Sequence, residues 1–137
     1  MPAVFELVRE IRPEDIDGLG HVNNLVYLKW MQSAAMAHST EQGWSADRYQ
    51  ELKAGWVVRS HFIEYLRPAF TNHGIIVRTW VSDMKRFASM RRYQILRDSD
   101  RLVLAKAETN WAFVDYVTGK LTRVPNEVAE SFEIVTE

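Results

Sequence analysis

A short acidic segment carries the residue types that a hydrolytic site requires. It reads Asp15-Ile16-Asp17-Gly18-Leu19-Gly20-His21-Val22-Asn23-Asn24 and directly precedes a stretch that favours a helix. Carboxylates near a helix N-terminus lie beside backbone N–H groups that have no partner within the helix. Such donors can bind a carbonyl oxygen as negative charge develops on it. The segment therefore combines a candidate general base with a candidate oxyanion site.

The same residues also fit a purely structural role. Asp15 or Asp17 can cap a turn, the glycines can take positive φ, and Asn23 can cap the helix. His21 beside this turn is either a hydrogen-bonded structural residue or an assistant in proton transfer. Residue types and spacing leave both interpretations open.

One helix is expected after this segment, over residues 23–40. The stretch lacks Pro and Gly, is rich in Leu, Ala, Met and Trp, and is followed by Gly43 as a C-terminal stop. Its apolar side chains surround the helix, so we expect other elements to enclose most of it. Tyr27, one turn past Asn23, either lines a pocket or packs in the core. A second, short polar helix is expected over 45–53.

Strand patterns account for most of the remaining chain. They cover residues 3–11, 56–66, 75–83, 88–97 and 102–114, with turn residues at 72–74 and 98–100 and a terminal helix at 126–133. In the last strand, Ala105 and Ala107 share one face and leave room for an element to lie close against it. The expected fold class is α+β, a long antiparallel sheet wrapped around one central buried helix.

The composition describes one foldable domain. The chain has 137 residues, of which 47% are hydrophobic and 12% aromatic, so a core can close without disulfides or a structural metal. No repeat or linker divides it, which predicts a single domain over 1–137. Seventeen basic and 18 acidic residues leave a formal charge of -1. This balance argues against nucleic acid or an anionic membrane surface as a partner.

Several chemistries are not expected. Cysteine is absent, which removes disulfides and thiolate catalysis and suits a reducing compartment. The first residues do not resemble a signal peptide, and no run of roughly 18 apolar residues follows, so a cytoplasmic protein is expected. The histidines show no metal-ligand spacing, and we expect no metal site. They are His21, His38, His61 and His73.

Three motifs resemble those of a known family. The pattern Asp15-x-Asp17-x-x-Gly20-His21-Val22-Asn23-Asn24-x-x-Tyr27, followed by Trp30, resembles the signature of the 4-hydroxybenzoyl-CoA thioesterase-like group of hotdog-fold acyl thioesterases. Segments 63–69 and 114–120 are similar to the Tyr-x-Arg-Pro-Ala and Asp-x-x-Thr-Gly-Lys motifs of that group. The His-Val-Asn-Asn form looks closest to bacterial long-chain acyl-CoA thioesterases and plant acyl-ACP thioesterases. The similarity spans about residues 5–126.

The resemblance implies a hotdog fold, thioester hydrolysis without a cofactor, and assembly into a homodimer or homotetramer with active sites at the subunit interface. It implies that Asp17 is the catalytic carboxylate, as general base or nucleophile, and that the Asn24 N–H polarises the thioester carbonyl. The implied substrate is an acyl-CoA or acyl-carrier-protein thioester.

A basic stretch is the candidate binding site for coenzyme A. Lys85, Arg86, Arg91 and Arg92 flank residues 87–90, a region where relatives often contact the coenzyme A moiety. Arg86, Ser89 and Arg91, with Tyr27, are therefore the expected substrate-binding residues. Basic side chains there can meet phosphates, or they can form an ordinary charged strand edge.

The chain departs from the family pattern on the helix. Relatives often have Glu-x-Ala-Arg where this chain has Gln32 and Ala35, and residues 23–40 contain no Asp or Glu at all. Two alternatives to a thioesterase therefore stay open: a hydratase or dehydratase acting on acyl thioesters, and a non-catalytic acyl-binding module. The sequence does not determine acyl chain length, aromatic or aliphatic preference, or the choice between CoA and acyl carrier protein.

Overall fold

The computed structural model describes residues 3–70 and 73–136, so Asn72 of the expected turn lies outside the described residues. All five expected strands are present, with ends displaced by at most two residues. In chain order, the elements are β1 (Val4–Glu10), a 3-10 turn η1 (Pro13–Asp15), α1 (Asn24–Glu41), α2 (Ala46–Leu52), β2 (Ala54–Tyr65), β3 (Gly74–Val81), β4 (Ala88–Arg97), β5 (Val103–Asp115) and α3 (Asn126–Ala129). The terminal helix is shorter than expected and ends at Ala129.

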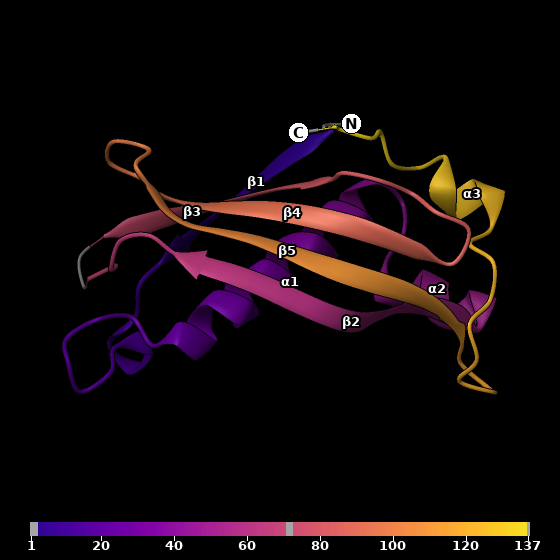
Figure 1. Cartoon of the computed structure of the whole chain (residues 1–137), viewed down its shortest axis with the longest axis horizontal. Coiled ribbons are helices and arrows are strands. Elements are labelled where there is room, and N and C mark those ends of the chain that lie inside the picture. Colours follow the sequence, from indigo (N-terminus) through magenta and orange to yellow (C-terminus); the bar gives the residue numbers. More distant parts are fainter. Residues whose placement is uncertain (1–2, 71–72, 137) are drawn as a thin grey trace.

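The strands form one antiparallel sheet in the order β1-β3-β4-β5-β2 (Figure 1). Helix α1 lies against one face of this sheet, which confirms the expected α+β class. None of the helices in the described residues is long and apolar enough to cross a membrane.

Alternation along β5 places two alanines in the same core cluster as the helix. Ala105 and Ala107 are buried in the core cluster that also contains α1, whereas Lys106 between them is exposed. The pattern predicts their shared buried face, while the helix backbone comes closest to β3 and β1. Trp111 further along the strand is partly buried against the same cluster.

Helix α1 is enclosed on one side only. Its buried residues face the sheet and comprise Val26, Tyr27, Trp30, Met31, Ala34, Ala35 and His38. The opposite stripe includes Leu25 and Met36, which are 65% and 60% exposed. The expectation that other elements enclose most of the helix is therefore wrong for the single chain, because five strands cover only one of its sides. Two large apolar side chains of α1 remain in contact with solvent.

A second, smaller core closes the far end of the molecule. Helices α2 and α3 lie at the end of the sheet opposite the segment that joins β1 to α1 (Figure 1). Their apolar residues pack with Trp44, Phe113 and Phe132 in one buried cluster. The two ends of α1 thus meet different surroundings, a loop at its N-terminus and an aromatic cluster at its C-terminus.

A volume increase at Ala105 tests this packing. We expect Ala105→Leu to lower the free energy of unfolding by about 1–3 kcal/mol, since extra methylene groups between helix and sheet force neighbouring side chains from their preferred rotamers. Urea denaturation measures the change. Lys106→Leu puts the same side chain on the exposed face and should stay within about 0.5 kcal/mol of the parent. Equal effects at both positions would contradict the described register.

Candidate active site

The segment between η1 and α1 folds as a small hairpin. The Asp17 N–H donates to the His21 carbonyl (2.8 Å), and the Asn23 N–H donates to the Asp15 carbonyl (2.7 Å). Ile16 and Val22 pair between them in an antiparallel bridge. The hairpin places Asp17 opposite His21, and the chain continues from it directly into α1.

One oxygen of the Asp17 carboxylate accepts hydrogen bonds from the hairpin backbone. Its Oδ1 accepts from the backbone N–H groups of Leu19 (2.9 Å) and His21 (3.2 Å). Its Oδ2 has no donor among the residues that the structure describes. These bonds orient the carboxylate and leave one oxygen able to accept a proton from a bound water. Asp15 differs, because its Oδ2 accepts from the Arg12 N–H (2.9 Å) and caps η1.

Helix α1 begins directly after the hairpin. Asn23 is the N-cap, and its side chain accepts from the Leu25 N–H (3.0 Å), as the structural interpretation expects. Asn24 is the first helical residue, and an N–H at this position has no acceptor within the helix. Because the positive end of the helix dipole also lies here, the Asn24 N–H is suited to a developing oxyanion.

The second sequence motif anchors the hairpin. The Val22 N–H donates to the Ala69 carbonyl (3.0 Å), and the Tyr65 hydroxyl donates to the Asn24 carbonyl (3.2 Å). The His21 ring stacks edge-on against Phe70 at 5.2 Å between centroids. The segment after β2 therefore fixes the hairpin relative to the sheet, which explains why these two distant motifs occur together.

A small cavity of about 310 Å³ lies beside the hairpin. His21, Asn24 and Tyr27 line one side of it, and residues 65–68 line the other. Tyr27 also packs edge-on against Trp30 and Tyr65, so both expected roles for this residue apply. Burial raises the pKa of the Tyr27 phenol. The cavity thus brings His21, Asn24 and Tyr27 together, and Asp17 lies across the hairpin from them.

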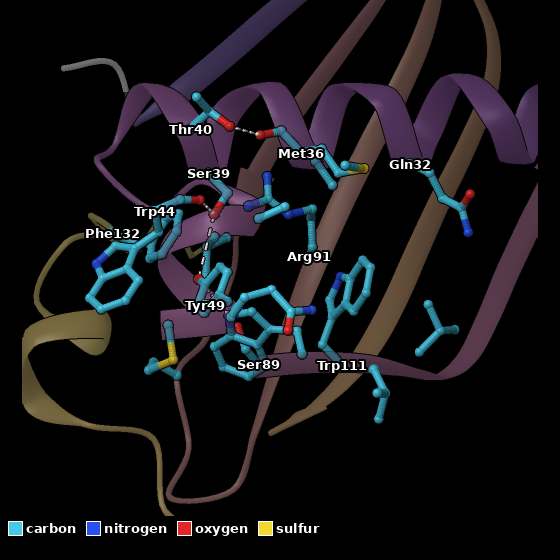
Figure 2. Close-up of a pocket in the computed structure, with 18 of the residues that line it drawn as sticks. Gln32, Met36, Ser39, Thr40, Trp44, Tyr49, Ser89, Arg91, Trp111 and Phe132 are labelled. Atoms are coloured by element: carbon cyan, nitrogen blue, oxygen red, sulfur yellow. Dashed lines mark hydrogen bonds between the residues drawn. The ribbon is translucent and has the colours of Figure 1, made fainter. Parts of the chain in front are cut away.

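A larger cavity of about 500 Å³ lies at the other end of α1 (Figure 2). Its wall is built from the C-terminal half of α1, from α2 and from strands β2, β4 and β5. Its lining is mostly apolar and includes the aromatic side chains of Trp44, Tyr49, Trp56, Trp111 and Phe132. On α1 the lining residues of this cavity begin at Gln32, roughly 12 Å along the helix from Asn24, and extend to Thr40, roughly 24 Å from it at 1.5 Å per residue. The catalytic candidates are not among the residues that line the larger cavity of the same chain.

The expected coenzyme A residues separate into two groups. Arg86 is exposed in the turn between β3 and β4. Ser89 and Arg91 are buried and line the larger cavity, and the Ser89 hydroxyl donates to the Asp83 carbonyl (2.8 Å). The interpretation of Arg91 as part of a charged strand edge is wrong, because its side chain points to the core face of β4. Ser89, Arg91 and Tyr93 are spaced two residues apart and therefore share the core face of the strand, and this spacing was the sequence signal for the burial of Arg91.

The sequence interpretation missed the partners of Arg91. They are His38 on α1 and Thr79 on β3, both buried. It also missed Gln32 and Met36 as lining residues of the larger cavity. Gln32 stands where relatives often carry Glu, so this wall of the cavity is uncharged. Among the described residues, His, Asp and Glu side chains form no group of three that could hold a metal ion.

The third motif forms a turn at the end of β5. The Asp115 Oδ1 accepts from the N–H groups of Val117 (2.8 Å) and Thr118 (3.0 Å). These backbone donors lower the pKa of the Asp115 carboxyl. The following Tyr116 lines the larger cavity, so the motif shapes that cavity rather than the hairpin site.

Comparison with known proteins places this fold among thioesterases. A family model described as the thioesterase-like superfamily matches residues 11–132. A 1,4-dihydroxy-2-naphthoyl-CoA thioesterase from Synechocystis is similar in structure, with a TM-score of 0.85, 17% identity and coverage of 93% of this chain and 94% of that chain. A thioesterase from Thermus thermophilus, solved with coenzyme A and zinc, has a TM-score of 0.80 and 23% identity, with coverage of 93% and 95%.

A protein of unassigned function from Aquifex aeolicus also shares the fold, with a TM-score of 0.87, 22% identity and coverage of 94% of this chain and 99% of that chain. No curated protein sequence matches the chain significantly. At these identities the solved structures establish the hotdog fold alone, and the family follows from the sequence match.

Two glycines of the hairpin allow a matched test of its geometry. Gly20 has φ +81°, where a side chain is strained, whereas Gly18 lies outside that region and no atom lies within 4 Å of a Cβ added to it. We expect Gly20→Ala to cost about 1–2 kcal/mol of stability and Gly18→Ala to cost little. Thermal unfolding of both variants measures the difference. A larger loss for Gly18→Ala would contradict the hairpin described.

Proposed function

The chain belongs to the thioesterase-like superfamily, and we propose that it hydrolyses acyl-CoA thioesters to the free acid and coenzyme A. The observation that carries this proposal is the hairpin that holds the Asp17 carboxylate and leads directly into α1. Asp17 supplies Oδ2, which has no donor among the described residues, and Asn24 supplies the first N–H of α1. Hydrolysis of a thioester requires at least a base and an oxyanion donor.

In the proposed reaction, Asp17 accepts a proton from water as the water oxygen bonds to the thioester carbon. The carbonyl oxygen takes up negative charge and receives the Asn24 N–H. Collapse of the tetrahedral intermediate breaks the carbon–sulfur bond, and the departing thiolate takes the proton. Direct attack by the Asp17 carboxylate remains the alternative route. His21, which donates its backbone N–H to Asp17, orients the carboxylate in either case.

Assembly would complete this site. Of the two edges of the described sheet, β1 is the shorter and exposes Glu6, Arg9 and Glu10 beside a single valine, Val8. The longer edge β2 exposes the charged residues Arg59 and Glu64 and three apolar side chains, Val57, Val58 and Phe62. Charged edges resist pairing, and long edges with exposed apolar residues favour it. We therefore propose a two-fold dimer in which the β2 strands of two copies pair antiparallel and extend the sheet. The same edge can serve a dimer within a homotetramer.

Such a dimer brings the separated parts together. A two-fold axis between β2 strands makes the two α1 helices antiparallel, so the N-terminus of one lies beside the C-terminal half of the other. The Asp17 hairpin of one protomer then faces the larger cavity of its partner. The exposed Leu25 and Met36 become buried at the same interface, which accounts for apolar residues on all sides of α1.

The larger cavity is the proposed acyl pocket. Its aromatic lining provides an apolar site for an acyl chain. Arg86 lies in the exposed turn between two lining residues, Met84 and Ser89, and there it can meet the phosphates of coenzyme A outside the cavity. Tyr27 borders the smaller cavity near the reacting carbonyl. An acyl carrier protein could present the same thioester in place of coenzyme A.

Substitution of Asp17 separates chemistry from folding. In Asp17→Asn the amide oxygen can keep both backbone hydrogen bonds of Oδ1, while the base is lost. We expect the hydrolysis rate to fall by roughly two to four orders of magnitude with little change in melting temperature. Release of free thiol from a panel of acyl-CoA substrates measures the rate.

Asp15→Asn is the matched control for this variant, since Asp15 caps η1 on the same hairpin. It should retain most of the activity. Hydrolysis by Asp17→Asn at near the parent rate would exclude the assigned mechanism. Failure of the parent protein to release thiol from any substrate would favour the acyl-binding module, and formation of a hydrated acyl-CoA would favour the hydratase.

Light scattering tests the proposed assembly. We expect particles of at least twice the chain mass at micromolar concentration. Phe62→Glu on β2 should raise the dimer Kd at least about tenfold, because it places like charges at the seam of the extended sheet. Val8→Glu on the exposed face of β1 should leave the Kd unchanged. A monomeric parent protein, or dissociation caused by the β1 variant alone, would overturn the β2 interface.

A further inference from the structure

A single arginine lies in the wall of the otherwise uncharged larger cavity. Arg91 is 5% exposed, and it is the only charged residue among the described residues that line this cavity. Figure 2 shows its side chain beneath α1, with Ser39 and Tyr49 on one side and Trp111 on the other. A pocket built only for an aliphatic chain has no use for a cation at this position.

The hydrogen bonds of Arg91 leave part of its guanidinium unused. Nη1 donates hydrogen bonds to the His38 Nδ1 (2.9 Å) and to the Thr79 hydroxyl oxygen (3.2 Å). A guanidinium only donates, so His38 Nδ1 is the acceptor. Within residues 3–70 and 73–136, Nε and Nη2 have no acceptor and Arg91 forms no ion pair. The two unused groups are the parallel pair of donors that matches both oxygens of a carboxylate.

Burial of this charge is unfavourable without a counter-charge. Removal of the guanidinium from water destabilises its charged form and lowers the pKa of Arg91. The aromatic side chains Tyr49 and Tyr93 lie near it, but neither carries a negative charge at neutral pH. An anionic ligand group would supply the missing counter-charge.

We propose that Arg91 binds a carboxylate at the far end of the acyl group, so that the preferred substrates are thioesters of dicarboxylic acids. This inference rests on the proposed thioesterase function and names its substrate class. The Nε and Nη2 groups bind the distal carboxylate, and His38 and Thr79 hold the guanidinium in place through Nη1. The aromatic walls contact the methylene chain between the carboxylate and the thioester.

Matched substrates test the proposal. The kcat/KM values are measured for a series of α,ω-dicarboxylyl-CoA thioesters and for monocarboxylic acyl-CoA thioesters of equal carbon number. We expect the parent protein to prefer at least one dicarboxylyl substrate by about tenfold or more over its monocarboxylic match. Arg91→Met should lower kcat/KM for that substrate by about a hundredfold, without lowering it for the monocarboxylic match. Arg91→Lys, which keeps the charge but loses the paired donors, should fall between the two.

Arg92→Met is the matched control. Arg92 follows on the same strand, forms an ion pair with Glu108 at 3.0 Å and does not line the cavity. Its loss should leave the substrate preference unchanged. A structural role for Arg91, in which it only ties α1 to the sheet, predicts that Arg91→Met lowers hydrolysis of both substrate classes equally. That result, or a parent protein with no preference for dicarboxylyl substrates, would overturn the inference while the thioesterase function stands.

A binding measurement keeps the test decisive where catalysis or folding of a variant fails. The free dicarboxylic acid that matches the best substrate should raise the Tm of the parent protein, and the monocarboxylic acid of equal length should raise it less. If the parent hydrolyses no thioester but shows this difference, the proposed function fails and the carboxylate site stands. If it hydrolyses thioesters and shows no difference between the acids, the carboxylate site is excluded.

Discussion

The packing of α1 along one face of the antiparallel sheet determines where every other functional element lies. The helix comes closest to β1 and β3, and its buried residues share one core cluster with Ala105 and Ala107 of β5. The hairpin that carries Asp17 directly precedes its N-terminus, and residues of its C-terminal half line the larger cavity. The catalytic candidates of the hairpin are not among the residues that line the larger cavity of the same chain.

The position of the hairpin and the larger cavity at different parts of α1 gives a reason for the apolar surfaces that the single chain exposes. The apolar residues on the open side of α1 and along β2 are costly in a monomer and useful in an assembly. Pairing through β2 would bury them and would also bring a hairpin from one copy to the cavity of another. The same contact would thus stabilise the protein and complete its site.

The charged groups near the two ends of α1 differ in their exposure to water. At the N-terminus, Asp17 is held by backbone donors on one oxygen and remains partly exposed, which suits a group that exchanges protons with water. At the other end, Arg91 is removed from water and keeps its unused donors in an aromatic cavity. In the proposed function these two residues have different tasks, reaction for Asp17 and substrate recognition for Arg91.

The sequence alone predicted the strands, the helices and the turn before α1, since each depends on local patterns: alternation in β5, the N-cap Asn23, and the glycine at position 20. Only the tertiary structure decided which side of α1 is buried, because apolar residues on all sides give the helix no preferred direction. It also decided the contact of Arg91 with His38, 53 residues away in sequence, and of Val22 with Ala69. Such contacts arise from the packing of helix on sheet, which no local pattern encodes.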